Sequence, residues 1–315
     1  MRNLFVFCLV LPKYEASEGD NMTKTGFIAI VGRPNVGKST LLNSVIGEKV
    51  AIVSKKPQTT RNRITGIHTV GEEQFVFLDT PGLHKPRTKL GDFMVKTTND
   101  TIGGVDGVVL VVEAREEVGD IEAEIIRGIK AKGVGAILVI NKIDTVRPEN
   151  IAKTIKSYSE AFDFDSVIPI SAKNGKGVDI VVDECRRYLN ESNWFFSDEI
   201  VTDQPERQMV AEIIREKLLR TLDEEIPHGT AVVIEDWKEK RGTVSIRAEI
   251  YCEKATHKGI IIGKNGASIK RIGSYAREDI ENLLDTKVFL DLYVRVKENW
   301  RESDFNIANL GYTEE

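Results

Sequence analysis

Four short motifs with side chains suited to nucleotide chemistry follow one another along the 315-residue chain. They are GRPNVGKS at residues 32–39, DTPG at 79–82, NKID at 141–144 and SAK at 171–173. A glycine-rich loop of the first type wraps phosphates with its backbone N–H groups, and the second motif senses the last phosphate. The third and fourth are suited to a guanine ring. Their order predicts a protein that binds GTP and responds to its hydrolysis.

The first two motifs predict a magnesium-triphosphate site. Lys38 should reach the β- and γ-phosphates, and Ser39 should give its hydroxyl to Mg²⁺. Asp79, at the end of an apolar strand, should hold the Mg²⁺ shell. The Gly82 N–H should contact the γ-phosphate, so that the loop after it is ordered only in the GTP state.

A threonine from the segment PQTTRNR at residues 57–63 should complete the Mg²⁺ shell in the GTP state. We favour Thr60 over Thr59 for this role. The alternative is that this segment is an ordinary polar loop or the start of a strand.

Asp144 should make the site selective for guanine over adenine. Its carboxylate can accept hydrogen bonds from guanine N1–H and the exocyclic amine, whereas adenine lacks that donor pair and would leave the charge unpaired. A backbone N–H of residues 171–173 should meet guanine O6. The predicted nucleotide-binding residues are Gly32, Asn35, Val36, Gly37, Lys38, Ser39, Thr40, Asp79, Gly82, Asn141, Lys142, Asp144, Ser171, Ala172 and Lys173.

The usual water-orienting residue is missing. In Ras-like proteins a glutamine directly follows the DxxG glycine, and here that position is Leu83. We therefore predict slow intrinsic hydrolysis that a partner or an ion accelerates. Asn35 is a candidate K⁺ ligand beside the phosphates, and His84 is a candidate base, although a lone histidine in such a loop is more often structural. The predicted catalytic residues are Lys38, Thr60 and Gly82.

Apolar runs place each motif just after a strand. Residues 26–31, 74–78, 107–112, 136–140 and 167–170 are typical of strands in a covered parallel sheet. Helical stretches at residues 38–46, 121–130, 150–158 and 178–189 accompany these runs. This alternation predicts a sheet with helices on both faces and ligands at its carboxyl edge. The predicted fold class is an α/β P-loop GTPase domain with a mostly parallel sheet.

The pattern divides the chain into four parts. Residues 22–190 should form the GTPase domain, and residues 191–205 should form a linker whose aromatic residues pack on a domain surface. Residues 206–315 contain helical and strand-like runs of a second domain. The apolar run in residues 1–21 faintly resembles a short signal peptide, but it is too short to span a bilayer and lacks a clear cleavage site. We therefore interpret residues 1–21 as an N-terminal extension or an upstream start.

The second domain contains GKNG at residues 263–266, between an apolar helical run and the long helical stretch 267–284. This arrangement is typical of a KH module, whose GxxG loop clamps nucleic-acid backbone. The chain has a formal net charge of −5, yet residues 254–277 hold six basic and no acidic side chains. A solvated helix face is the alternative. The predicted RNA-binding residues are Lys258, Gly263, Lys264, Asn265, Gly266, Lys270 and Arg271.

Taken together, these motifs resemble the Era family of bacterial GTPases over about residues 23–312. The resemblance implies one GTPase domain followed by an α+β type II KH domain, with GTP or GDP and Mg²⁺ as cofactors. It also implies binding to the 3′ end of 16S rRNA, assistance to assembly of the small ribosomal subunit, and a cytoplasmic location with peripheral association at the inner face of the cell membrane. We expect a monomer. The family lacks residues 1–21. The most specific matching segments are residues 32–40, 57–67, 79–86, 141–144, 213–219 and 263–273.

One rival hypothesis remains. The protein could be a membrane-associated signalling GTPase whose second domain binds a protein or lipid partner through the basic residues. In the first hypothesis, GTP exposes the KH surface to single-stranded RNA and GDP releases it. Ordered switch loops should then change the docking of the two domains.

Overall fold

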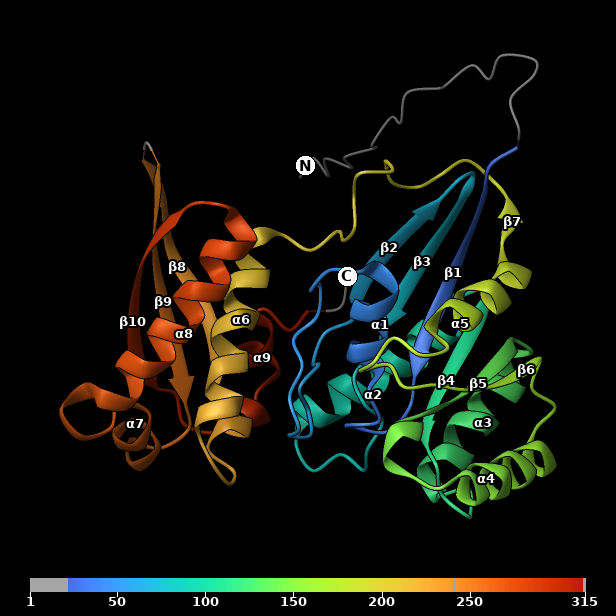
Figure 1. The fold of residues 1–315 in the computed structure, drawn as a ribbon. Helices are drawn as coiled ribbons and strands as arrows, with labels where there is room; N and C mark the ends of the chain where they lie inside the picture. The colour runs from blue at the N-terminus through green and yellow to red at the C-terminus, as the bar shows by residue number, and fades with distance from the viewer. Residues whose placement is uncertain (1–21, 241, 314–315) are drawn as a thin grey trace, which may run out of the picture.

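The computed structural model describes residues 22–240 and 242–313, which form two domains (Figure 1). The predicted extension at residues 1–21 lies outside the described residues. The first domain has a sheet of order β2-β3-β1-β4-β5-β6, with β7 beside β1. Only β2 and β7 run antiparallel to their neighbours in this sheet, so the predicted α/β class is confirmed. Its strands are β1 Lys24–Val31, β2 Ile64–Val70, β3 Glu73–Asp79, β4 Gly107–Glu113, β5 Gly135–Asn141, β6 Ser166–Pro169 and β7 Asn190–Glu191.

Alternating side chains of these strands fill two cores, one on each face of the sheet. In β1, Ile28 and Ile30 belong to one core and Ala29 and Val31 to the other. Side chains of α1 and α5 complete the first core, and those of α2, α3 and α4 complete the second. Because both faces are covered, the strands are almost continuously apolar, as the sequence predicts. These helices are α1 Lys38–Ile46, α2 Lys89–Ile102, α3 Asp120–Lys132, α4 Pro148–Ala161 and α5 Val178–Cys185.

The second domain has a sheet of order β10-β9-β8, in which β9 pairs parallel with β10 and antiparallel with β8. Helices α6 and α8 supply apolar side chains to the core on this sheet. This is the predicted α+β KH fold. No helix in the described part of the chain is long and apolar enough to cross a membrane. Its elements are α6 Glu206–Thr221, β8 Ala231–Lys240, β9 Thr243–Cys252, α7 Ala255–Ile262, α8 Ala267–Leu284, β10 Lys287–Val296 and α9 Asp304–Asn309.

The segment predicted as a linker lies along the first domain. Strand β7 already includes Glu191, so the sheet extends one residue into that segment. The Trp194 indole N–H donates to the carbonyl oxygen of Glu72 at 3.2 Å. The Phe195 and Phe27 rings have centroids 5.1 Å apart. The aromatic residues therefore pack on the first domain, as expected.

A further apolar core joins the two domains. Leu90 and Met94 of α2 are buried together with Trp300, Ile307 and Tyr312 from the C-terminal part of the chain. The sequence analysis assigned no element to α2 or α9. Because this core takes side chains from both domains, it holds the KH domain against the GTPase domain.

Candidate nucleotide and RNA sites

The four nucleotide motifs meet at the carboxyl edge of the first sheet, around a cavity of about 870 Å³. This volume lies within the usual range of ligand sites. Gly32, Val36, Asp79, Ser171 and Ala172 are buried and are not among the residues that line this cavity. The predicted residues that line the cavity are Asn35, Gly37, Lys38, Ser39, Thr40, Thr60, Gly82, Asn141, Lys142, Asp144 and Lys173.

The phosphate loop follows β1 directly and leads into α1. Gly37 precedes α1 with a φ of 102°, and a Cβ atom there would lie 2.3 Å from the Asn141 amide nitrogen. Only glycine fits this position. Lys38 is buried, and its ammonium donates to the carbonyl oxygens of Gly32 at 3.2 Å and Arg33 at 3.1 Å. Burial lowers the pKa of Lys38 to about 8, and a phosphate would stabilise its charged form.

The three predicted Mg²⁺ ligands lie together. Ser39 Oγ donates to Asp79 Oδ2 at 2.5 Å and lies 2.9 Å from Thr60 Oγ1. The Thr59 hydroxyl instead donates to the carbonyl oxygen of Lys56 at 2.7 Å, so the geometry favours Thr60. Asp79 Oδ1 is buried without a hydrogen-bond partner in the described part of the chain, and burial raises the pKa of Asp79 to about 6. Both observations fit a divalent cation bound to this carboxylate.

Asn141 joins the phosphate loop to the SAK loop. Its amide nitrogen donates to the carbonyl oxygen of Val36 at 2.8 Å, and its carbonyl oxygen accepts from the Ala172 N–H at 2.9 Å. The Ser171 N–H is bonded within its own loop. The Lys173 N–H has no partner among the described residues and is therefore the candidate donor to guanine O6.

The carboxylate predicted to recognise the base is held by a neighbouring hydroxyl. Ser171 Oγ donates to Asp144 Oδ1 at 2.6 Å, and this hydrogen bond lowers the pKa of Asp144. The Lys142 ammonium donates to the backbone carbonyl of Asn35 at 2.6 Å. The Asn35 amide nitrogen in turn donates to the carbonyl oxygen of Lys55 at 2.8 Å. The side-chain oxygen of Asn35 is then the atom available to a K⁺ ion, which remains a prediction.

Residues 49–63, which we call the switch segment, connect the nucleotide site to the KH domain. Arg61 is 1% exposed, and its guanidinium lies 5.7 Å from the Trp300 ring centroid and 5.6 Å from that of Tyr312. It donates to the carbonyl oxygen of Thr230 at 2.7 Å and to the Tyr312 hydroxyl at 2.9 Å. A residue of the first domain is thus buried inside the second.

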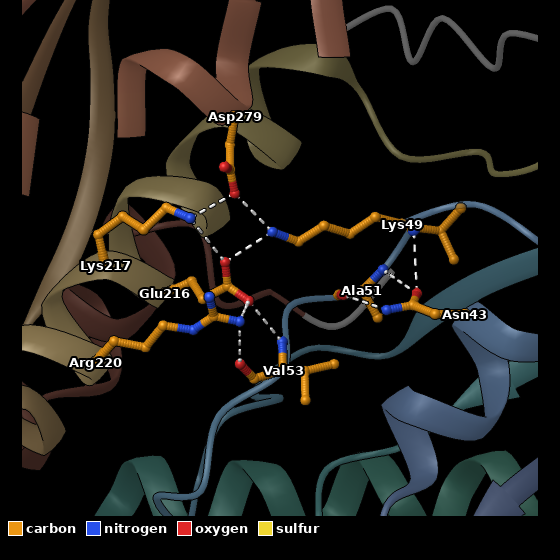
Figure 2. Close-up of polar contacts among 9 residues, drawn as sticks. Asn43, Lys49, Ala51, Val53, Glu216, Lys217, Arg220 and Asp279 are labelled. Atoms are coloured by element: carbon orange, nitrogen blue, oxygen red, sulfur yellow. Dashed lines mark hydrogen bonds and ion pairs between the residues drawn. The ribbon is translucent and has the colours of Figure 1, made fainter. Parts of the chain in front are cut away.

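Glu216 of α6 fastens the start of the switch segment (Figure 2). Its fully buried carboxylate accepts from the Lys49 ammonium at 2.7 Å, the Val53 N–H at 3.0 Å and the Arg220 guanidinium at 2.9 Å. Lys49 also pairs with Asp279 of α8 at 2.9 Å. Burial would raise the pKa of Glu216, but the hydrogen bonds from Lys49 and Val53 outweigh it and lower this pKa.

The preceding residue on α6 contacts the residue next to the predicted metal ligand. Arg215 is fully buried, and its guanidinium donates to the carbonyl oxygen of Thr59, directly before Thr60. The sequence analysis missed these contacts. The available signal was the pair of charged residues, Arg215 and Glu216, inside an apolar helical stripe, which is unusual unless both are paired.

The GxxG loop has the backbone geometry of an exposed clamp. Gly263, Asn265 and Gly266 have φ angles of 73°, 52° and 76°. A Cβ atom on Gly266 would meet nothing within 4 Å, so its surroundings leave room for an approaching ligand. Figure 1 places α7 and this loop at the end of the KH domain away from the GTPase domain. Six basic side chains here are exposed and have no ion pair with a described residue: Lys254, Lys258, Lys264, Lys270, Arg271 and Arg277.

A shallow groove of about 290 Å³ runs between α8 and β10 beside these charges. Its apolar lining includes Ile269, Leu290 and Leu292, with the exposed ring of Phe289. The sequence analysis predicted only the charged rim. Half-buried strands commonly alternate apolar and polar residues as β10 does, so nothing in the sequence marked its side chains as part of a groove.

A phosphate-loop α/β domain followed by a KH fold defines a class of GTPases with a C-terminal RNA-binding module. Residues 27–142 match the family described as 50S ribosome-binding GTPase, and residues 225–301 match the KH domain family. The chain belongs to the Era family of GTPases. It is 49% identical to GTPase Era of Ruminiclostridium cellulolyticum over 290 residues, which covers 92% of this chain and 97% of the relative. It is 50% identical to GTPase Era of Clostridium kluyveri over 292 residues, covering 92% and 100%.

Two solved Era structures share the whole architecture. One is an Aquifex aeolicus Era variant bound to GDP·AlF₄⁻, with a TM-score of 0.89 and 36% identity. The other is Era in complex with MgGDPNP and nucleotides 1506–1542 of 16S ribosomal RNA, with a TM-score of 0.89 and 37% identity. Each match covers 93% of this chain and all of the other. This chain is therefore a GTPase of the two-domain Era type.

Proposed function

We propose that this protein is a GTP-switched RNA-binding protein that binds the 3′ end of 16S rRNA and assists assembly of the small ribosomal subunit. The observation that carries this proposal is that one short segment contacts both the nucleotide site and the KH domain. Thr60 lies 2.9 Å from Ser39 at the metal site, while its neighbour Arg61 is buried in the KH domain. The Era relative with bound 16S rRNA supports the class of RNA.

Hydrolysis is an in-line attack of water on the γ-phosphorus. Mg²⁺, when bound, neutralises charge on the β- and γ-phosphates, and Ser39, Thr60 and Asp79 would hold it. Lys38 adds positive charge at the same phosphates, and the Gly82 N–H orients the γ-phosphate. These groups act by position and charge, which is the main contribution of proteins to phosphoryl transfer.

The nucleotide state is coupled to domain docking through the switch segment. With GTP and Mg²⁺ bound, Thr60 is held at the metal, and this position is compatible with the Arg61 guanidinium lying against the stacked rings of Trp300 and Tyr312. When the γ-phosphate is lost, Thr60 is no longer held at the metal, and the docked arrangement of the two domains becomes less stable. In the docked arrangement the GxxG loop faces solvent, so GTP should favour RNA binding. By linkage, RNA should also favour GTP.

The test is the affinity for a fluorescent single-stranded RNA copy of the small-subunit 3′ end, measured by anisotropy at fixed salt. The protein is loaded with GDP or with a non-hydrolysable GTP analogue. Tighter binding with the analogue is expected, and equal affinity in both states would refute the switch. The double variant Lys264→Asp with Asn265→Asp should lose RNA binding in both states. Lys130→Asp with Lys132→Asp in α3 is the matched control and should bind normally.

Comparing vesicle binding with RNA binding separates this function from the rival one. We infer a monomeric cytoplasmic protein whose membrane association is at most peripheral. Binding to vesicles rich in anionic lipid, measured by flotation, should be weak beside RNA binding. Strong vesicle binding without RNA binding would favour the membrane-associated signalling GTPase.

A further inference from the structure

The GTPase domain needs a group to orient the attacking water, and the usual position cannot supply it. Leu83 is 3% exposed and belongs to the core behind the sheet, so its side chain points away from the phosphates. A different polar side chain must therefore face the place where the γ-phosphate lies. The candidates are those that line the nucleotide cavity beside Gly82, whose N–H is expected to contact that phosphate.

Gln58 of the switch segment meets this requirement. It lines the nucleotide cavity together with Lys38, Thr60 and Gly82. Its backbone has a φ of 58°, in the left-handed region that glutamine rarely adopts. Residues of this kind persist where their surroundings fix them, and they cluster at functional sites.

Hydrogen bonds determine which way the Gln58 amide points. The ring nitrogen Nδ1 of His84 lies 3.0 Å from the carbonyl oxygen of Gly82, which can only accept, so Nδ1 carries the proton. In the neutral ring Nε2 is then an acceptor. It lies 3.1 Å from the amide nitrogen of Gln58, which must donate to it. The Gln58 carbonyl oxygen makes no hydrogen bond with the described residues and can accept one from water.

We propose that Gln58 is the catalytic residue that orients the attacking water and that His84 is its positioning residue. The water oxygen bonds to the γ-phosphorus while the bond from that phosphorus to the β–γ bridging oxygen breaks, and GDP leaves with that electron pair. One proton of the water remains on inorganic phosphate and the other passes to solvent. Gln58 accepts a hydrogen bond throughout and takes no proton. His84 does not act as the base in this step, because its Nε2 accepts a hydrogen bond from the Gln58 amide and its Nδ1–H donates to Gly82.

The test compares Gln58→Ala and the near-isosteric Gln58→Met with the wild-type protein. Single-turnover GTP hydrolysis should fall on the order of 10²-fold in both, as for loss of one preorganised hydrogen-bonding group. The affinity for a non-hydrolysable GTP analogue should stay within twofold, whereas binding of AlF₄⁻ to the GDP complex should weaken, because only the latter needs the oriented water. Gln208→Ala, in α6 outside the nucleotide cavity, is the matched control and should behave as wild type.

A double-mutant comparison tests the role of His84. His84→Ala should slow hydrolysis, and the double variant with Gln58→Ala should be no slower than Gln58→Ala alone, because His84 acts through Gln58. Wild-type hydrolysis in Gln58→Ala and Gln58→Met would overturn the proposal. A further large loss in the double variant would overturn the assignment of His84 as a positioning residue. The proposal for Gln58 would also be overturned if hydrolysis fell only in proportion to weaker binding of the GTP analogue.

Discussion

Replacing Glu216 with glutamine should loosen the two domains without touching the nucleotide. Two hydrogen bonds to this buried carboxylate cross the domain boundary, from Lys49 at 2.7 Å and Val53 at 3.0 Å. A hydrogen bond to a charged group contributes about 1.5–3 kcal/mol. The Lys49 side chain is 42% exposed, so the low end applies to it, and glutamine keeps an acceptor for Val53. We expect a loss of about 2 kcal/mol in docking free energy, or roughly thirtyfold in the docking equilibrium.

Single-molecule FRET with the GTP analogue bound would measure this equilibrium. Dyes on cysteines at Ile180 of α5 and Phe289 of β10 would report the distance, since both positions are exposed. Cys185 and Cys252 are fully buried and should resist labelling, and Cys8 is replaced by serine. The Glu216→Gln protein should populate a second distance that the wild type shows rarely.

A matched control and a double-mutant cycle make the result specific. Asp236→Asn removes a carboxylate paired with Lys238 at 2.6 Å inside the KH domain and should leave the distances unchanged. Lys49→Met should resemble Glu216→Gln, and the double variant should cost less than the sum of the two. Strict additivity, or an unchanged distance distribution in Glu216→Gln, would refute the reasoning.

The remaining predictions concern base choice, ion dependence, the RNA clamp and pH. Asp144→Asn should lower GTP affinity on the order of 10²-fold. The same variant should gain affinity for xanthosine triphosphate, whose ring has a carbonyl where guanine has an amine. Calorimetry measures both affinities. Turnover should be faster in K⁺ than in Na⁺ buffer and lose that difference in Asn35→Ala; equal rates in the wild type would exclude the K⁺ site. Gly266→Asn should keep its melting temperature, because asparagine tolerates a positive φ, yet bind RNA more weakly in the anisotropy assay. The pKa of Glu216 is lowered, so its contribution is present above its ordinary value of 4.5 and is lost as pH falls through the lower folded value; the melting-temperature difference between wild type and Glu216→Gln should vanish in that acid range.

The meeting of the four nucleotide motifs at one edge of the sheet could be predicted because each motif is contiguous and follows an apolar strand. Ser39 and Asp79 are 40 residues apart, yet their side chains meet at 2.5 Å because parallel strands end at the same edge of the sheet. The choice of Thr60 also agrees with the geometry. The roles of single amides in the SAK loop could not be predicted, because they depend on which N–H groups Asn141 already occupies.

The contacts between the domains could not be predicted. Arg61 and Arg215 are charged residues of a kind usually solvated, and they are buried here because their guanidinium groups donate to backbone carbonyls more than 150 residues away. No periodicity encodes a contact of that kind. Helix α2 was missed for a related reason. Its apolar residues Leu90 and Met94 pack on the C-terminal segment of the other domain and not on a nearby strand.

The adjacency of Thr60 and Arg61 predicts that domain docking and metal coordination depend on each other. Consecutive Cα atoms are about 3.8 Å apart, so a switch segment that retracts from the metal by a few ångströms must also pull Arg61 away from the stacked rings of Trp300 and Tyr312. That move would break the three hydrogen bonds of the Arg61 guanidinium and leave their buried acceptors in the KH domain unpaired. The free energy needed to break these hydrogen bonds therefore opposes retraction of the switch segment while the KH domain is docked. The KH domain is therefore an energetic partner of the γ-phosphate in holding the switch segment, and any ligand that favours the docked arrangement should slow the loss of Thr60 from the site.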